Sequence, residues 1–160
     1  MSTTVQGVVE REDDRAIEVR RTIDAPRARV FEAWTDVRHI SRWWGPHGFT
    51  TTTKSFEFRP EGAWEFTMHG PDGTDFPNLV QWQEIERPAR LVYRQGTSAA
   101  DPHWFTTTVT FLERDGKTEV VLRSVFVTKA LRDEVVEKYG AIEGGHDTLE
   151  RFSAYVAALG

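Results

Sequence analysis

Few residues of this chain have the type and spacing that proton transfer needs, and the candidate carboxylates are Glu65 and Glu84. Glu65 and Glu84 each fall in a segment whose side chains alternate between two faces. Alternation places Glu65 opposite the face that carries Trp64, whereas it places Glu84 on the same face as Trp82. Glu84 is therefore either a buried carboxyl with a raised pKa or a surface carboxylate at the end of a strand.

The histidines do not show the spacing of a metal site, and no P-loop, dinucleotide fingerprint or nucleophile elbow is present. We therefore predict no metal and no cofactor. One histidine, His146, lies between Ile142 and Leu149 near an apolar stripe, which predicts either a satisfied, partly buried side chain or a polar contact to a ligand. The other four are His39, His47, His69 and His103.

Aromatic side chains dominate the rest, with six tryptophans and ten phenylalanines. Alternation places several of these aromatic side chains on one face of consecutive strands, together with Met68, Val80 and Glu84. This face predicts either an ordinary core or the wall of a ligand cavity. A cavity can form because large rings leave gaps where they do not interdigitate. Trp43 and Trp44 are adjacent on an expected helix, about 100° apart, so we expect that both cannot face the same core. One of them should lie at a cavity mouth or pack under the Gly45–Phe49 loop. The predicted cavity residues are Trp34, Trp43, Trp44, Phe49, Trp64, Phe66, Met68, Val80, Trp82, Glu84, Tyr93, Ile142, His146 and Leu149.

The elements that must position these residues follow from the hydrophobic periods. Ala16–Ile23 alternates and predicts a strand, and Asp24 is expected to cap a short helix with Pro26 in its first turn. A second short helix, Val37–Trp44, should end at Gly45-Pro46. Six antiparallel strands with turn residues between them follow, at Thr50–Arg59, Ala63–His69, Phe76–Glu86, Arg90–Gln95, Trp104–Arg114 and Thr118–Phe126.

The last third returns to a helical period. Lys129–Tyr139 predicts a helix that is broken or bent near Gly140, and an apolar stripe then continues to Leu159. Gly144 and Gly145 are costly inside a helix, so they indicate either a loose first turn or a close approach of the helix backbone to the sheet or to a ligand. The order of elements predicts an α+β fold in which a curved antiparallel sheet of about seven strands wraps around the terminal helix.

Length and composition narrow the class of protein. The 160 residues fit one domain, expected over 16–160 after a flexible arm at 1–15. There is no cysteine, the formal net charge is −5, and no apolar run is long enough to cross a membrane. The acidic balance argues against a nucleic-acid partner, and no leader pattern is present, so we expect a cytoplasmic protein.

Several motifs resemble those of the bacterial homologues of the activator of heat-shock protein 90 ATPase, which belong to the START-like (SRPBCC) superfamily together with polyketide cyclases. The resemblance runs from about Ile17 to Leu159. Its motifs are Asp24-Ala25-Pro26, Val30-Phe31-Glu32-Ala33-Trp34-Thr35-Asp36, Trp43-Trp44-Gly45-Pro46, Arg59-Pro60-Glu61-Gly62-Ala63-Trp64, Met68-His69-Gly70-Pro71-Asp72-Gly73, Pro88-Ala89-Arg90-Leu91-Val92-Tyr93 and Gly140-Ala141-Ile142-Glu143-Gly144.

The resemblance implies a helix-grip fold, in which a seven-stranded antiparallel sheet grips the terminal helix around an apolar cavity. Relatives in the superfamily bind lipids, sterols, hormones or polyketides, some catalyse cyclisation or dehydration, and the eukaryotic namesake stimulates a chaperone. The first expectation is therefore a binding protein for an apolar or aromatic small molecule or lipid. The alternatives are a cyclase or dehydratase using Glu84, Tyr93, Arg123 or His146, and a chaperone-related or stress-response interaction protein. A homodimer through an exposed edge strand is also expected.

Overall fold

The computed structural model describes residues 11–159, and the alternating segment Ala16–Ile23 forms its first strand, β1. Two short helices follow, α1 (Arg27–Thr35) and α2 (Val37–Ile40). Most of the predicted arm at 1–15 lies outside the described residues. Its end forms a short 3-10 helix, η1 (Glu12–Arg15), whose Glu12 and Asp13 carboxylates pair with Arg123.

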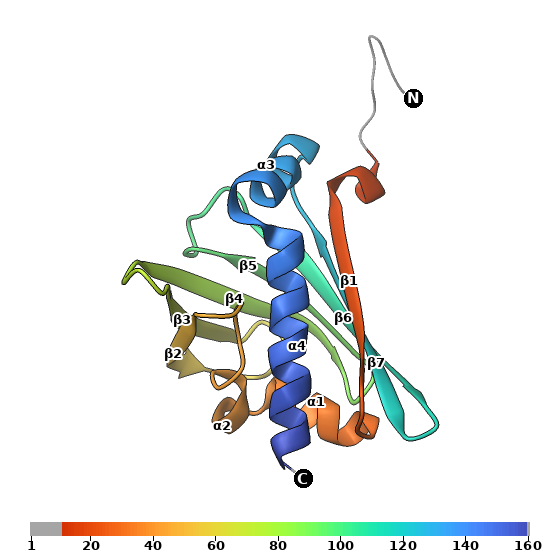
Figure 1. The fold of residues 1–160 in the computed structure, drawn as a ribbon. Coiled ribbons are helices and arrows are strands. Elements are labelled where there is room, and N and C mark those ends of the chain that lie inside the picture. Colours follow the sequence, from red (N-terminus) through yellow and green to blue (C-terminus); the bar gives the residue numbers. More distant parts are fainter. Residues whose placement is uncertain (1–10, 160) are drawn as a thin grey trace.

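Six further strands form an antiparallel meander, as the turn signals predict. They are β2 (Thr50–Phe56), β3 (Ala63–His69), β4 (Asp75–Glu86), β5 (Arg90–Gly96), β6 (Phe105–Arg114) and β7 (Lys117–Val125). The order across the sheet is β1-β7-β6-β5-β4-β3-β2, so the first strand closes onto the last one and β1 and β2 are the edges. Figure 1 shows this sheet curving behind the C-terminal helix.

The predicted helical third divides into two helices, α3 (Lys129–Tyr139) and α4 (Ala141–Leu159). Thr128 caps α3, since its hydroxyl accepts from the Leu131 N–H at 3.0 Å. Gly140 ends α3 in the left-handed conformation with φ 60°, which glycine adopts without steric cost. The bend expected near Gly140 is therefore a break, and α4 alone lies along the hollow of the sheet (Figure 1).

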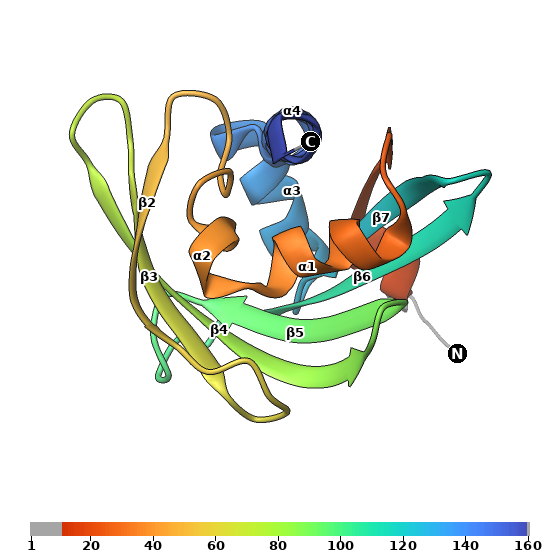
Figure 2. The same ribbon diagram turned by 90° about the horizontal axis from the view of Figure 1, so that it is seen from below.

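Both short helices sit inside the curve of the sheet beside α4 (Figure 2), and they differ in detail from the expectation. Asp24 is exposed and does not cap α1; the capping position is Pro26, which offers no side-chain acceptor. α2 ends at Ile40 instead of Trp44, and residues 41–43 form a turn. The 100° helical offset therefore does not apply to Trp43 and Trp44, and both are buried in one core with ring centroids 5.6 Å apart.

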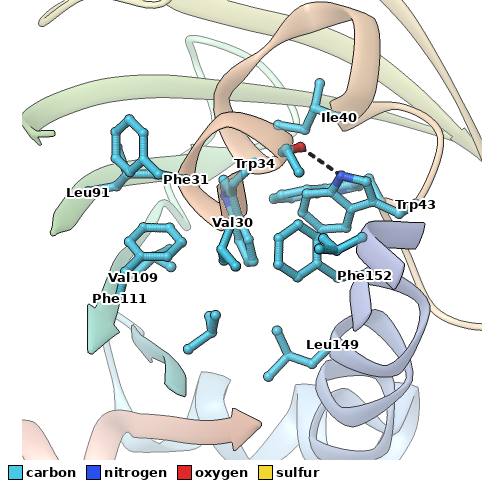
Figure 3. Close-up of a cluster of buried hydrophobic side chains, with 14 of the residues drawn as sticks. Val30, Phe31, Trp34, Ile40, Trp43, Leu91, Val109, Phe111, Leu149 and Phe152 are labelled. Atoms are coloured by element: carbon cyan, nitrogen blue, oxygen red, sulfur yellow. Dashed lines mark hydrogen bonds between the residues drawn. The ribbon is translucent and has the colours of Figure 1, made fainter. Parts of the chain in front are cut away.

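The core joins α1, α4 and the concave face of the sheet through aromatic contacts (Figure 3). Trp34 of α1 packs on Phe152 of α4 with ring centroids 5.1 Å apart, and on Phe111 of β6 at 6.0 Å. Trp43 donates its indole N–H to the Ala33 carbonyl at 3.0 Å, which fixes the turn after α2 against α1. Each such buried ring stabilises the fold by about 2 kcal/mol through removal of apolar surface from water.

Candidate functional site

A cavity of about 320 Å³ lies between the first turns of α4 and the concave face of the sheet. The central strands β5, β6 and β7 form its floor, α4 and the end of α3 form one wall, and the loop after α2 forms another. Tyr139, which is 72% exposed, stands at the junction of α3 and α4 and marks the mouth. The lining residues are Trp34, Trp44, Gly45, Pro46, Met68, Tyr93, Gln95, Phe105, Thr107, Leu122, Ser124, Tyr139, Gly140, Ala141, Gly144, Gly145 and Thr148.

The helix wall consists of small residues, and its two adjacent glycines have different neighbours. A Cβ on Gly145 would lie 3.1 Å from a methyl carbon of Val19, so this glycine lets α4 approach β1 closely. A Cβ on Gly144 would meet only the Pro46 ring, at 3.9 Å. Of the alternatives expected for these glycines, Gly145 shows the close approach of the helix backbone to the sheet, whereas Gly144 borders the cavity.

The loop wall is fixed to α4 by Arg151. Its guanidinium nitrogen Nη1 donates to the carbonyl oxygens of Trp44, Gly45 and Pro46 at 3.3, 2.9 and 3.1 Å. Partial burial lowers the pKa of Arg151. Next to it, His47 pairs with Glu150 and holds the pKa of that carboxyl below its ordinary value.

Within this loop, Gly45 has φ 105°, and a Cβ there would lie 3.0 Å from the terminal methyl of Met68. A side chain at this position would therefore be strained and would also press on the cavity wall.

The floor carries a row of three hydroxyl groups from adjacent strands. Tyr93 of β5 pairs with Thr107 of β6, which pairs with Ser124 of β7. The Thr107 and Ser124 hydroxyl oxygens are 2.8 Å apart, and Thr107 lies beside Tyr93 in the pairing of β6 with β5. Burial raises the pKa of Tyr93, so its phenol is neutral at physiological pH.

The described part of the chain gives this cavity an uncharged wall. Among residues 11–159, none of those that line it is an aspartate, glutamate, lysine, arginine or histidine. A smaller cavity of about 180 Å³ adjoins it toward β1 and shares Phe105, Leu122, Ser124, Ala141 and Gly145 with it.

Only some of the predicted cavity residues meet at this site. Trp34, Trp44, Met68 and Tyr93 line the cavity. Phe49 is partly buried against Phe76, and Ile142 is a partly buried residue at the margin of the core. The packed core holds Trp43, Trp64, Phe66, Val80, Trp82 and Leu149.

Two polar residues of the prediction do not reach the cavity. The expectation that Glu84 shares a face with Trp82 is wrong, because the register shifts between them: Trp82 pairs with Tyr93 and Glu84 with Val92. Glu84 is exposed and forms an ion pair with Arg90 at 2.7 Å. His146 is also exposed, and the expected partial burial is wrong.

Sequence reasoning missed the polar floor, Gln95, Thr107 and Ser124. Threonine and serine in alternating strands are typical of any sheet surface, and only the register of β5, β6 and β7 brings these side chains together. The glycines of α4 were the one local signal for this end of the molecule.

One chain of hydrogen bonds on the opposite face has the connectivity of a hydrolase triad. His69 Nε2 lies 2.8 Å from the Thr52 hydroxyl, and its Nδ1 lies 2.7 Å from Asp75 Oδ1. These side chains lie on the outer face of the sheet beside its edge strand β2, and none of the three is buried. We assign them no catalytic role.

Residues 11–159 show neither a metal-binding cluster nor a membrane-spanning helix. In that part of the chain, no three histidine, cysteine, aspartate or glutamate side chains are grouped so that they could hold a metal ion. No helix of the same residues is both long and apolar enough to cross a membrane.

Known proteins share this fold over nearly the whole chain. A solution NMR structure of a protein from Arthrobacter aurescens matches with a TM-score of 0.85 and 27% identity, over 97% of this chain and 93% of that one. A crystal structure of a protein from Nitrosomonas europaea matches with a TM-score of 0.81 and 19% identity, over 91% and 96%. The crystal structure of the AHSA1 protein from Silicibacter pomeroyi matches with a TM-score of 0.73 and 16% identity, over 91% and 99%.

Of two sequence comparisons, one agrees with this similarity. A search of the curated proteins finds no match. The sequence model of one family, described as activator of Hsp90 ATPase homolog 1-like protein, matches residues 24–157. The matched region contains α1, the whole meander and nearly all of α4, and the seven-stranded sheet around a C-terminal helix is the helix-grip architecture of the START-like superfamily. This chain belongs to the family of activator of Hsp90 ATPase homolog 1-like proteins.

Proposed function

We propose that this protein binds a small, predominantly apolar molecule in the cavity between α4 and the sheet. The observation that carries the proposal is the cavity itself, about 320 Å³ beside a core in which tryptophans and phenylalanines are otherwise closely packed. Its volume is at the lower end of the range for small-molecule sites, and its wall is mostly apolar with a few convergent polar groups, as in such sites generally.

The proposal assigns no reaction. Of the four residues named for a cyclase, Glu84 and His146 are exposed and outside the cavity, and Arg123 is paired with the acidic residues of η1. Tyr93 lines the cavity, but burial raises its pKa and keeps its phenol neutral. A cyclase would need a positioned acid or base next to its substrate. Association with a chaperone, which the family's description suggests, and the homodimer stay predictions.

Titration with a neutral, apolar fluorophore, N-phenyl-1-naphthylamine, tests the proposal. Trp34 and Trp44 line the cavity, so a bound fluorophore should quench tryptophan emission while its own emission rises. We expect one saturable site per chain. A linear, non-saturating rise, with tryptophan emission unchanged, would contradict the proposal.

A further inference from the structure

We propose that the ligand is an uncharged molecule with an apolar body and one hydrogen-bonding oxygen, and that this oxygen binds at the hydroxyl row Tyr93–Thr107–Ser124. The inference rests on the proposed function, because it assigns a chemical class to the occupant of the same cavity. The proposed ligand class excludes fatty acids and other carboxylates as occupants of this cavity.

No ionised group is present among the lining residues. A carboxylate that leaves water for such a wall loses its hydration and gains no opposite charge, which is among the costliest transfers in a protein. The nearest cation on the loop wall is Arg151. Its Nη1 donates to three backbone carbonyls, and its side chain borders the outer surface of α4 with His47 and Glu150.

The polar groups that do line the cavity differ in how far the protein already satisfies them. Thr148 donates its hydroxyl to the Gly144 carbonyl at 2.8 Å, and Gln95 donates its amide to Asn78 at 2.9 Å, so both are engaged with the protein. The hydroxyl row is different, because its three hydroxyls carry three O–H donors and the Thr107–Ser124 hydrogen bond uses only one of them.

Ser124 is the end of the row that a ligand can reach. Thr107 is 2% exposed and Tyr93 is equally buried, whereas Ser124 is only partly buried and borders both cavities. A ligand oxygen on Ser124 would complete the row, while the apolar body would lie between Leu122, Phe105 and the glycines of α4.

Three probes of nearly equal shape test the inference in competition with N-phenyl-1-naphthylamine. They are 2-acetylnaphthalene, 2-ethylnaphthalene and 2-naphthoate, which present a ketone oxygen, no oxygen and a charged carboxylate. We expect the ketone to bind roughly five-fold more tightly than the ethyl compound, the gain typical of one hydrogen bond. We expect 2-naphthoate to bind at least about 100-fold more weakly than the ketone.

Two variants locate the oxygen. Ser124→Ala should remove the ketone's advantage over 2-ethylnaphthalene. Thr118→Val is the control, because it also removes a buried hydroxyl, but one outside the cavity lining. The Thr118 hydroxyl donates to the Ala25 carbonyl at 2.8 Å. This variant should leave the order of the three probes unchanged.

The outcomes separate the two proposals. Equal binding of 2-naphthoate and the ketone, or a ketone advantage that survives in Ser124→Ala, would overturn the inference while the proposed function stands. If neither the fluorophore nor any of the three probes binds, the proposed function itself fails, and the inference fails with it.

Discussion

Gly144 of α4 and Pro46 of the loop after α2 both line the cavity, and a Cβ on Gly144 would have the Pro46 ring, 3.9 Å away, as its nearest neighbour. At Gly144 the helix therefore contributes backbone and no side chain to the cavity wall. Both residues line the same space, so a larger side chain at position 144 would enter it without displacing the core.

Filling this gap should abolish binding while the protein stays folded. Gly144→Leu places a leucine side chain in the cavity, and replacing a helical glycine also favours the helix by up to about 1 kcal/mol. We expect the fluorophore titration to lose its saturable phase, with a thermal midpoint no lower than that of the parent protein. Glu143→Leu is the matched control: it adds the same side chain at an exposed neighbouring position, and it should bind as the parent does. Equal binding by the two variants would contradict the assignment of the cavity.

The three hydrogen bonds of Arg151 should matter for both stability and binding. Arg151→Met keeps much of the side chain's length and apolar contact but leaves the carbonyls of Trp44, Gly45 and Pro46 without their donor. We expect a loss of roughly 2 kcal/mol in the free energy of unfolding, measured with urea, and weaker fluorophore binding because the loop wall loosens. Arg42→Met, at an exposed residue on the same side of the molecule, should change neither by more than about 0.5 kcal/mol. A stable Arg151→Met with full affinity would refute this role.

Alanine at two glycines of the C-terminal helices should have opposite effects. Gly140 has φ 60°, so Gly140→Ala should destabilise the fold by about 1 kcal/mol. Gly144→Ala has ordinary helical geometry and open space, so it should stabilise the fold by up to about 1 kcal/mol. Urea unfolding of the two variants and the parent protein measures both stability changes. Shifts of the same sign would show that the break between α3 and α4 is not held by Gly140.

Acid should remove the contribution of Asp36 to stability. Its carboxylate accepts hydrogen bonds from the Arg38 side chain and, as the N-cap of α2, from the Arg38 backbone N–H. These hydrogen bonds lower the pKa of Asp36 to about 2. A carboxyl whose pKa is lowered by folding stabilises the protein above its unfolded pKa, and this stability is lost as the pH falls through the folded pKa. At pH 6 we expect the free energy of unfolding of the parent protein to exceed that of Asp36→Asn by only about 1 kcal/mol. The difference is small because most of the Arg38 side chain is exposed and solvent screens the pair.

The urea midpoints of the two proteins should converge between about pH 4 and pH 2. The amide side chain of the Asp36→Asn variant cannot titrate, so this variant serves as the reference throughout this range. A difference that stays constant down to pH 2 would show that the capping hydrogen bonds, and not the charge of Asp36, supply the stability.

The sequence predicted the order of elements because each period is local. Alternation at Ala16–Ile23 and in the meander, and the apolar stripe through Leu149 and Phe152, depend only on near neighbours. The resemblance in the family motifs further predicted that the sheet curves around α4, and the family match and the solved structures support this prediction. Boundaries were less accurate where side-chain contacts decide them, as at Trp43, whose hydrogen bond to Ala33 accompanies a turn in place of a helix.

The site was harder to predict because it depends on register. Alternation could not foresee the shift between Trp82 and Glu84, which turns Glu84 to the outer face. Nor could a single strand reveal that Thr107 and Ser124 become neighbours, since that pairing is a property of two strands together. Large aromatic residues were expected to border the cavity, but most of them interdigitate in the core. The cavity is left where the residues are small, at Gly144 and Gly145.

The most direct test of the account is to map bound 2-acetylnaphthalene on the ¹⁵N-labelled protein by amide chemical-shift perturbation. The ring of a ligand in this cavity would lie against the backbone of α4 and the floor of the sheet. We predict the largest shifts at Gly144, Thr107 and Ser124, and small ones at the outer-face residues Thr52 and His69. Shifts centred on the outer face, or spread evenly over the chain, would contradict the claim that the cavity is the binding site.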